Sequence, residues 1–210
     1  MLALIKREIR DHVLYFLAAI IFSAILVGLQ TVGAYNFDWQ QTGPYFGLMT
    51  IPTVMIFVFG LAGMGVSQMY IDKNRKISAF LTSLPVTRGR IFTAKVISGL
   101  LVILIVLTPV AIAAATLNSL LGSPIPAYGK LITDIFTTAF LMALACYSLG
   151  LLTGWTTSKL APSFGGLGMA IFLVTMISIK GFGLQIQLLL VLIIAASLTR
   201  TWRKYMSTPL

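Results

Sequence analysis

Charged side chains, and acidic ones above all, are scarce in this chain of 210 residues. Only 10% of the residues are charged, against about 25% in an average globular protein, and Asp and Glu together number 5. The mean hydropathy is +0.98. This composition is too apolar for a soluble domain and also too apolar for a disordered chain. The class that remains is a polytopic membrane protein.

Histidine and cysteine occur once each, as His12 and Cys146. A single cysteine excludes an internal disulfide, and His12 stands beside the N-terminal charges, where we expect an interfacial side chain outside the core. The sequence contains no HExxH, no GxSxG and no Cys/His set with metal-ligand spacing, and its GSPIPAYGK segment (122–130) has the wrong spacing for a P-loop. We therefore expect no catalytic residue, no metal and no cofactor in this chain, which is then not itself an enzyme.

Basic residues outnumber acidic ones by 15 to 5, which gives a net charge of +10. In a soluble protein this excess would suggest nucleic acid binding. Here the basic residues stand in short clusters between apolar runs, a pattern typical of topology signals in membrane proteins. We therefore expect no nucleic acid partner.

Apolar runs alternate with short polar segments along the whole chain, and an α-helix needs about 20 residues to cross the hydrocarbon of a bilayer. The pattern predicts one all-α transmembrane domain over residues 1–210, with an amphipathic segment at 1–12 and six spans at 13–32, 45–71, 96–117, 131–152, 164–179 and 184–198. The last two runs are short and flank Lys180-Gly181-Phe182-Gly183. This break favours a hairpin of two short spans, with a re-entrant pair as the alternative.

The basic clusters fall on one side of a six-span chain. They comprise the N-terminal Lys6, Arg7 and Arg10, most of the charges of the loop 72–95, Lys159, and the C-terminal Arg200, Arg203 and Lys204. Only Lys130 and Lys180 fall on the other side. Because cytoplasmic loops carry the excess of Lys and Arg, we expect both termini in the cytoplasm and a multi-pass protein of the cell (plasma) membrane.

Small residues form two faces on which helix backbones can approach closely. Gly60, Gly63 and Ser67 share one face of the second predicted span, and Gly150 and Gly154 form a GxxxG sequence at the inner end of the fourth. Packing within the chain and packing between two subunits are both consistent with such faces.

One acidic residue, Asp134, falls within a predicted span, near its outer end. Lys130 stands four residues earlier, so the two side chains can pair on one helix face. The alternative is a contact with a substrate or an ion.

The segment 72–95, DKNRKISAFLTSLPVTRGRIFTAK, is the long predicted cytoplasmic loop. Ile77, Phe80, Leu81 and Leu84 recur at i, i+3, i+4 and i+7, which predicts one apolar stripe of a short amphipathic helix. Such a helix can lie on lipid, with its basic residues on anionic headgroups. It can equally dock in the groove of a cytoplasmic partner.

Pro85 ends this helix, because the residue before a proline avoids the α conformation. Thr87 can cap the helix that follows. Arg88, Arg90 and Lys95 then stand near the start of that next helix, where we expect them at the membrane surface.

The run FLTSLPVTRGRIFTAK (80–95) resembles the "LLsLPvsR..iv..K" stretch of type-2 ABC exporter permeases. In that family the stretch follows an acidic residue at the inner end of the second helix, as it follows Asp72 here. The layout is similar as well: a basic amphipathic N-terminal segment, six spans, and one long loop between the second and third. The short fifth and sixth spans depart from the larger members, which carry an extracellular re-entrant element.

This resemblance implies a half-transporter. Two permease subunits, identical or not, would pair with two separate ABC ATP-binding subunits, which hold the ATP and Mg²⁺. The helix in the loop would be the coupling helix seated in a cleft of the ATPase, and the N-terminal segment would also contact the ATPase. The residues assigned to ATPase coupling are Asp72, Lys76, Ile77, Phe80, Leu81, Leu84, Pro85 and Arg88.

The substrate route would run between the two permeases, with Phe57, Met64, Phe136 and Met142 as candidate lining residues that could instead face lipid or the protein core. An uncharged route favours a hydrophobic or amphipathic cargo, such as a drug, a lipid or an antimicrobial peptide, moved by alternating access. The alternative is a non-transporting immunity or anchoring protein that binds a cytoplasmic partner and membrane lipid. Loss of transport with normal insertion in a Phe80→Arg variant separates the two.

Overall fold

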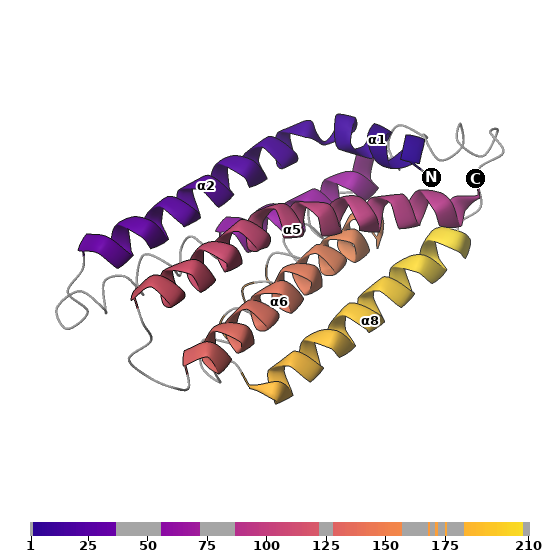
Figure 1. Ribbon diagram of the computed structural model, residues 1–210. Helices are drawn as coiled ribbons and strands as arrows, with labels where there is room; N and C mark the ends of the chain where they lie inside the picture. Colours follow the sequence, from indigo (N-terminus) through magenta and orange to yellow (C-terminus); the bar gives the residue numbers. More distant parts are fainter. Residues whose placement is uncertain are drawn as a thin grey trace.

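The structure is a computed structural model that describes residues 2–36, 56–71, 87–121, 128–156 and 183–207, together with Gly168, Ile171 and Thr175. Within these residues the fold is helical and contains no strand. The labelled helices of Figure 1 are α1 (Leu2–Asp11), α2 (Val13–Asn36), α5 (Arg88–Leu121), α6 (Tyr128–Thr156) and α8 (Leu184–Ser207). A further helix, Ile56–Ile71, is called helix 56–71 below.

Four of the described helices, α2, α5, α6 and α8, are long and apolar enough to cross a membrane. Helix 56–71 is apolar but shorter. The fold is therefore that of a multi-pass membrane protein.

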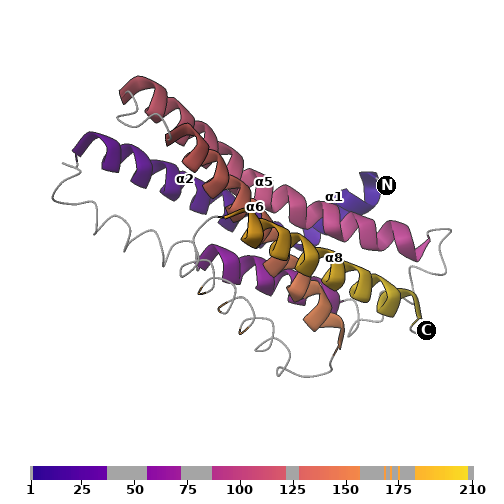
Figure 2. The ribbon, with the colours of Figure 1, turned by 90° about the horizontal axis from the view of Figure 1, so that it is seen from below.

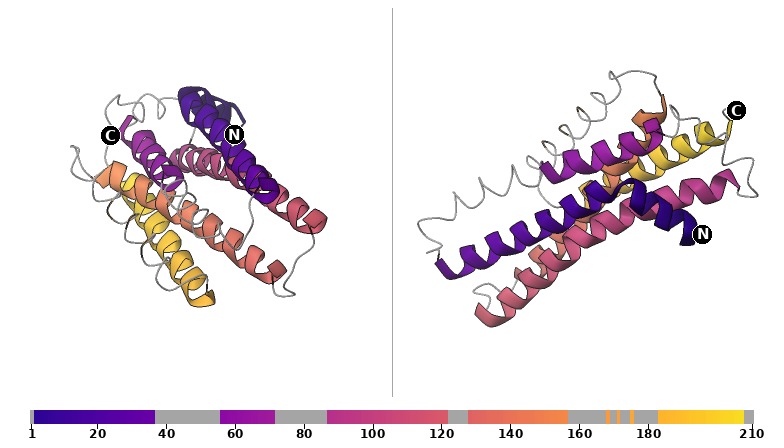
Figure 3. Two further views of the ribbon diagram at one scale, coloured as in Figure 1. Left: turned by 90° about the vertical axis from the view of Figure 1, so that its left-hand side faces the viewer. Right: turned by 90° about the horizontal axis from the view of Figure 1, so that it is seen from above.

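The long helices form a bundle in which α2 and α5 lie side by side, as do α6 and α8 (Figure 1). Helix 56–71 packs against α6, as the view of Figure 2 shows. The chain bends at His12, where the N–H of Tyr15 donates to the carbonyl of His12 at 2.9 Å, and α1 crosses the first turns of α5 (Figure 3, right). Both α1 and the last turns of α8 lie at one end of the bundle, which we call the junction end (Figure 1).

The structure confirms long apolar helices at four of the six predicted spans, 13–32, 96–117, 131–152 and 184–198. Of the second span, residues 56–71 are helical and residues 45–55 lie outside the described residues. The fifth, 164–179, lies outside them except for three isolated positions.

The sixth predicted span, 184–198, is the apolar part of a longer helix, because α8 has 24 residues and continues through Ser207. The run of basic residues near the C-terminus suggested an end at residue 198. However, Thr201 and Tyr205 are 0% and 3% exposed, so one face of the charged segment still packs on the bundle and keeps the helix intact.

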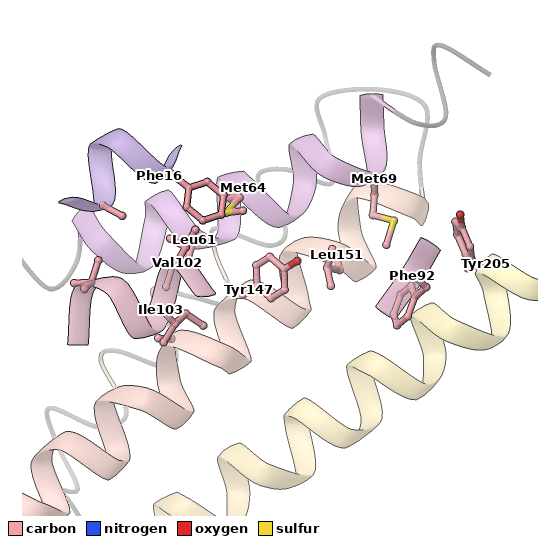
Figure 4. Close-up of a cluster of buried hydrophobic side chains, with 13 residues drawn as sticks. Phe16, Leu61, Met64, Met69, Phe92, Val102, Ile103, Tyr147, Leu151 and Tyr205 are labelled. Atoms are coloured by element: carbon pink, nitrogen blue, oxygen red, sulfur yellow. The ribbon is translucent and has the colours of Figure 1, made fainter. Parts of the chain in front are cut away.

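Two clusters of buried apolar side chains hold the helices together. The first joins α2, helix 56–71, α5, α6 and the end of α8, and Figure 4 shows Tyr147 among its members. The second joins Val58 of helix 56–71 to α6 and α8. Because lipid chains are as apolar as these side chains, close packing is what favours such contacts inside a membrane.

Helix 56–71 and α6 approach each other backbone to backbone. A Cβ atom on Gly150 would overlap the backbone of helix 56–71, and one on Gly154 would lie 2.6 Å from the carbonyl oxygen of Val66. On the facing helix, a Cβ on Gly65 would lie 2.6 Å from the carbonyl oxygen of Tyr147. The GxxxG pair of α6 thus lies at a contact within the chain that only glycine permits.

Gly60, Gly63 and Ser67 lie on helix 56–71 in a looser environment. A Cβ on Gly60 or Gly63 would meet no atom within 4 Å in the described part of the chain. The hydroxyl of Ser67 donates to the carbonyl of Met64 in its own helix at 2.9 Å. Neither glycine therefore marks a close helix contact among the residues described.

Candidate functional site

An ion pair between α1 and α5 is buried at the junction end. The Nζ atom of Lys95 lies 3.2 Å from each carboxylate oxygen of Glu8 and donates to the backbone carbonyl of Gln68 at 3.3 Å. Glu8 is 2% exposed and Lys95 is 1% exposed. Removing two charges from water costs several kcal/mol per ion, and their mutual attraction offsets this cost only while both partners are in place. This pair therefore holds α1 on the bundle in one defined arrangement.

Further charges on α1 surround the Glu8 carboxylate. The Nη2 atom of Arg7 lies 3.1 Å from Oε1 of Glu8, and its Nε atom lies 3.6 Å from Oδ2 of Asp11. Two carboxylates thus face two cations, Arg7 and Lys95, and these charges balance locally.

His12 stands at the bend after α1, and the prediction that it lies outside the core is wrong. It is 6% exposed, its Nε2 atom lies 3.9 Å from Oε2 of Glu8, and its ring centroid lies 6.0 Å from that of Tyr15. The physical reason is that α1 folds against α5, so His12, at the bend directly after α1, is enclosed with it.

Uncharged polar groups extend the ion pair across two more helices. The hydroxyl of Tyr147 lies 2.6 Å from Oε1 of Gln68 and 2.7 Å from the carbonyl oxygen of Lys95, either of which can accept its proton. The Nε2 atom of Gln68 donates to the hydroxyl of Ser98 at 3.0 Å, and that hydroxyl donates to the carbonyl of Lys95 at 2.7 Å. All four residues are at most 1% exposed.

We call this set the buried polar junction: Glu8, Gln68, Lys95, Ser98 and Tyr147. It joins α1, helix 56–71, α5 and α6 at a single point. A Cβ on Gly99 would overlap the Tyr147 ring, so glycine at this position makes room for the ring against α5. Each polar group of the junction has a partner, as buried polar groups require.

The buried polar junction was not predicted from the sequence, although the sequence carries one signal of it. Glu8 falls between Ile5 and Ile9 on the apolar stripe of α1, and Lys95 falls on the face of α5 that carries Phe92. Opposite charges on two apolar stripes indicate a pair that is buried together. Lys95 was expected at the membrane surface near the start of α5; the structure buries its side chain between α1 and α5, and this pairing allows the burial.

The first turns of α5 also contact the last turns of α8. The Nη1 atom of Arg88 lies 3.4 Å from the carbonyl oxygen of Met206. The Phe92 ring lies edge-on to the Trp202 ring, with centroids 5.2 Å apart, and 5.9 Å from the Tyr205 ring (Figure 4 shows Phe92 and Tyr205). The junction end thus gathers both ends of the described chain around the start of α5.

Arg88 is the one predicted coupling residue that the structure describes, and it is the first residue of α5. The carbonyl of Thr87 accepts the N–H of Arg90 at 3.0 Å, so the first helical hydrogen bond starts at the predicted cap. The other coupling residues lie outside the described residues: Asp72, Lys76, Ile77, Phe80, Leu81, Leu84 and Pro85.

The candidate route residues do not line one common surface within the chain. Phe57 and Met64 line an apolar cavity of about 150 Å³ between α2, helix 56–71 and α5. Met142 is 5% exposed and belongs to the second cluster, against α8. Phe136 lies half-buried on α6, away from this cavity.

Lys130 and Asp134 are both described, and their side chains form no ion pair with each other, so the predicted pairing is wrong. Lys130 is exposed and Asp134 is half-buried. The spacing permits a pair, but an exposed lysine gains little from one.

The polar groups of the junction have a structural role, because they hold the helices together. The Lys95 amine binds the Glu8 carboxylate, and the Tyr147 hydroxyl binds the Gln68 side chain and the Lys95 carbonyl. All of these groups are closed off from the surface. Within the described ranges, no group of three or more His, Cys, Asp and Glu residues could hold a metal ion.

No protein-family model matches the chain, and no curated protein matches it.

Proposed function

We propose that the chain is the membrane-spanning subunit of an ATP-driven ABC exporter. It crosses the cell membrane six times, with both termini in the cytoplasm. It works with a second permease subunit, either a copy or a relative, and with separate ATP-binding subunits that hold ATP and Mg²⁺. Segment 72–86 carries the coupling helix.

The observation that carries this proposal links the family-like motif to α1. The last residue of FLTSLPVTRGRIFTAK is Lys95, and its Nζ atom lies 3.2 Å from both carboxylate oxygens of Glu8. The resemblance assigns an ATPase contact to the segment before α5 and to the amphipathic N-terminal helix. A buried ion pair between α1 and α5 makes these two elements move together.

The positions of the neighbouring helices support the same role. Helix 56–71 ends just before segment 72–86, and α5 begins just after it. Gln68 and Lys95, near these two ends, are joined at 3.3 Å. A displacement of the segment by a closing ATPase therefore reaches helix 56–71, α5 and α1 as one unit. Such a unit can switch between two packed states when a partner binds ATP.

The cargo class follows from the character of the spans. The described helices carry few charges, and Glu8 and Lys95 are already paired. A route of this kind suits a hydrophobic or amphipathic substrate, such as a drug, a lipid or an antimicrobial peptide, better than an ion.

The test is the ATPase activity of the assembled complex carrying Phe80→Arg. This substitution places a charge on the apolar stripe of the coupling helix, so we expect the stimulation of ATP hydrolysis by the membrane subunit to disappear. Ala79→Arg is the matched control, because at about 100° per residue it falls on the opposite face. Normal insertion of both variants is checked by size-exclusion chromatography. Equal stimulation by the two variants contradicts the assignment.

A further inference from the structure

A cavity of about 150 Å³ lies between α2, helix 56–71 and α5, and its lining is almost entirely apolar. Phe22 and Phe57 close one end of it, where their rings stack with centroids 5.7 Å apart. Tyr15 lies at the other end, close to the bend between α1 and α2. Along α2 the cavity therefore spans about two helix turns, roughly 10 Å.

The cavity has a buried floor and an exposed rim. Leu61, Met64 and Val102 on the floor are 2%, 0% and 4% exposed, whereas Ile56 on the rim is 64% exposed and Gly60 is exposed. In the described part of the chain, the cavity thus opens on the side of the bundle. The helices around it are apolar, as helices that lie in a membrane are. The medium beside such an opening is the acyl-chain region of the bilayer.

An apolar cavity of about 150 Å³ stays free of water and accepts a benzene-sized apolar group. Left empty, its lining side chains lose dispersion contacts on one side. A segment of a lipid acyl chain is the group of this size that reaches a lateral opening in a bilayer.

Unbalanced positive charge stands near the Tyr15 end. Lys6 and Arg10 are exposed and four residues apart, so they share one face of α1. Among the described residues, neither forms an ion pair with an acid, in contrast to Arg7 and Lys95. Arg10 stands two residues before the bend at His12 and Tyr15 stands three residues after it. The two cations of α1 are therefore at the Tyr15 end of the cavity, the end where a lipid headgroup would lie.

We infer that this cavity binds an acyl chain of an anionic phospholipid whose phosphate lies against Lys6 and Arg10. The apolar floor selects the chain, and the two cations select the charge of the headgroup. This lipid is a resident of the subunit rather than its cargo, so the site goes beyond the proposed transport function.

The test is native mass spectrometry of the full chain, purified in mild detergent with whatever subunits accompany it. Phosphatidylglycerol is the probe, and phosphatidylcholine with identical acyl chains is the uncharged comparison. Gly60→Phe fills the mouth of the cavity without a backbone clash, because a Cβ there meets nothing within 4 Å. Gly28→Phe on α2 is the matched control, since its Cβ also meets nothing within 4 Å and it does not line the cavity.

We expect the unmodified chain and Gly28→Phe to bind phosphatidylglycerol about tenfold more tightly than phosphatidylcholine. Gly60→Phe should weaken the binding of both lipids by about tenfold. The pair Lys6→Gln and Arg10→Gln should remove the preference for the anionic lipid, while Arg200→Gln with Arg203→Gln should leave it intact.

Equal lipid binding by Gly60→Phe and Gly28→Phe overturns the inference, because lipid that merely coats the surface would not distinguish them. Loss of a second copy of the chain from Gly60→Phe, with lipid binding unchanged, also overturns it and assigns the mouth to a subunit interface. None of these readouts requires an ATPase. The lipid site and the proposed transport function can therefore fail separately.

Discussion

The Nζ atom of Lys95 and the carboxylate of Glu8 meet at 3.2 Å across 87 positions of sequence, inside the bundle. This pair joins the short basic helix at the N-terminus to the first turns of α5. It makes the N-terminal helix part of the packed structure at that end of the bundle. The consequences for stability, topology and assembly can each be measured.

Lys95→Met should lower the free energy of unfolding by about 3–5 kcal/mol, because it leaves the Glu8 carboxylate buried without its main partner. The measurement is thermal unfolding in detergent. Adding Glu8→Gln to Lys95→Met removes the stranded charge and should restore much of the loss. Lys130→Met is the control, because Lys130 is exposed. If Lys95→Met and Lys130→Met unfold at the same temperature, the ion pair does not hold α1 in place.

Tyr147→Phe should destabilise the protein by about 1 kcal/mol, because its hydroxyl bridges Gln68 and the Lys95 carbonyl at 2.6 and 2.7 Å. Hydrogen bonds between membrane helices are worth only about 0.6 kcal/mol on average, so a small shift is expected. Tyr70→Phe is the control, because Tyr70 is 42% exposed. The same unfolding assay reads both, and a Tyr147→Phe protein as stable as the control would show that the hydroxyl contributes nothing.

Gly150→Ala should be more destabilising than a methyl group usually is, since the added Cβ would overlap the backbone of helix 56–71. Forcing the two helices apart should cost about 1–3 kcal/mol. Gly63→Ala adds the same methyl group where no atom lies within 4 Å, so it should be neutral. Comparing the yield and unfolding temperature of the two variants checks this. Equal behaviour would mean that α6 and helix 56–71 are not in backbone contact.

The proposed six-span topology predicts that Gly122→Cys and Gly181→Cys react with a membrane-impermeant thiol reagent in intact cells. Ser78→Cys should react only after the cells are opened, because we propose that segment 72–86 faces the cytoplasm. Cys146 is the native cysteine and is buried, so we expect little background labelling from it. Labelling of Ser78→Cys in intact cells would reverse the assigned sides.

Hydropathy and charge spacing were enough to predict the apolar helices, because a long run of apolar residues between basic clusters forms few structures other than a membrane helix. They did not indicate that α8 continues past residue 198, since the buried Thr201 and Tyr205 are ordinary polar residues in sequence. Their burial depends on which face of α8 meets α6 and the start of α5, and the sequence alone does not show that face.

The buried polar junction could be predicted only in part. Glu8 and Lys95 each place a charge within an apolar stripe, which is visible in the sequence. The residues around each of them do not indicate that the two side chains contact one another. Gln68, Ser98 and Tyr147 give no signal at all, because uncharged polar residues are common in membrane helices. Their roles follow from the close approach that Gly99 and Gly150 permit.

We propose that this chain works as the membrane subunit of an ATP-driven exporter. The most direct measurement is affinity purification of the tagged chain in mild detergent, followed by mass spectrometry of the proteins that elute with it. The account predicts a stoichiometric P-loop ATPase, and its loss in the Phe80→Arg variant but not in Ala79→Arg. A chain that elutes without an ATPase in several detergents would contradict the account and favour a membrane protein that does not transport.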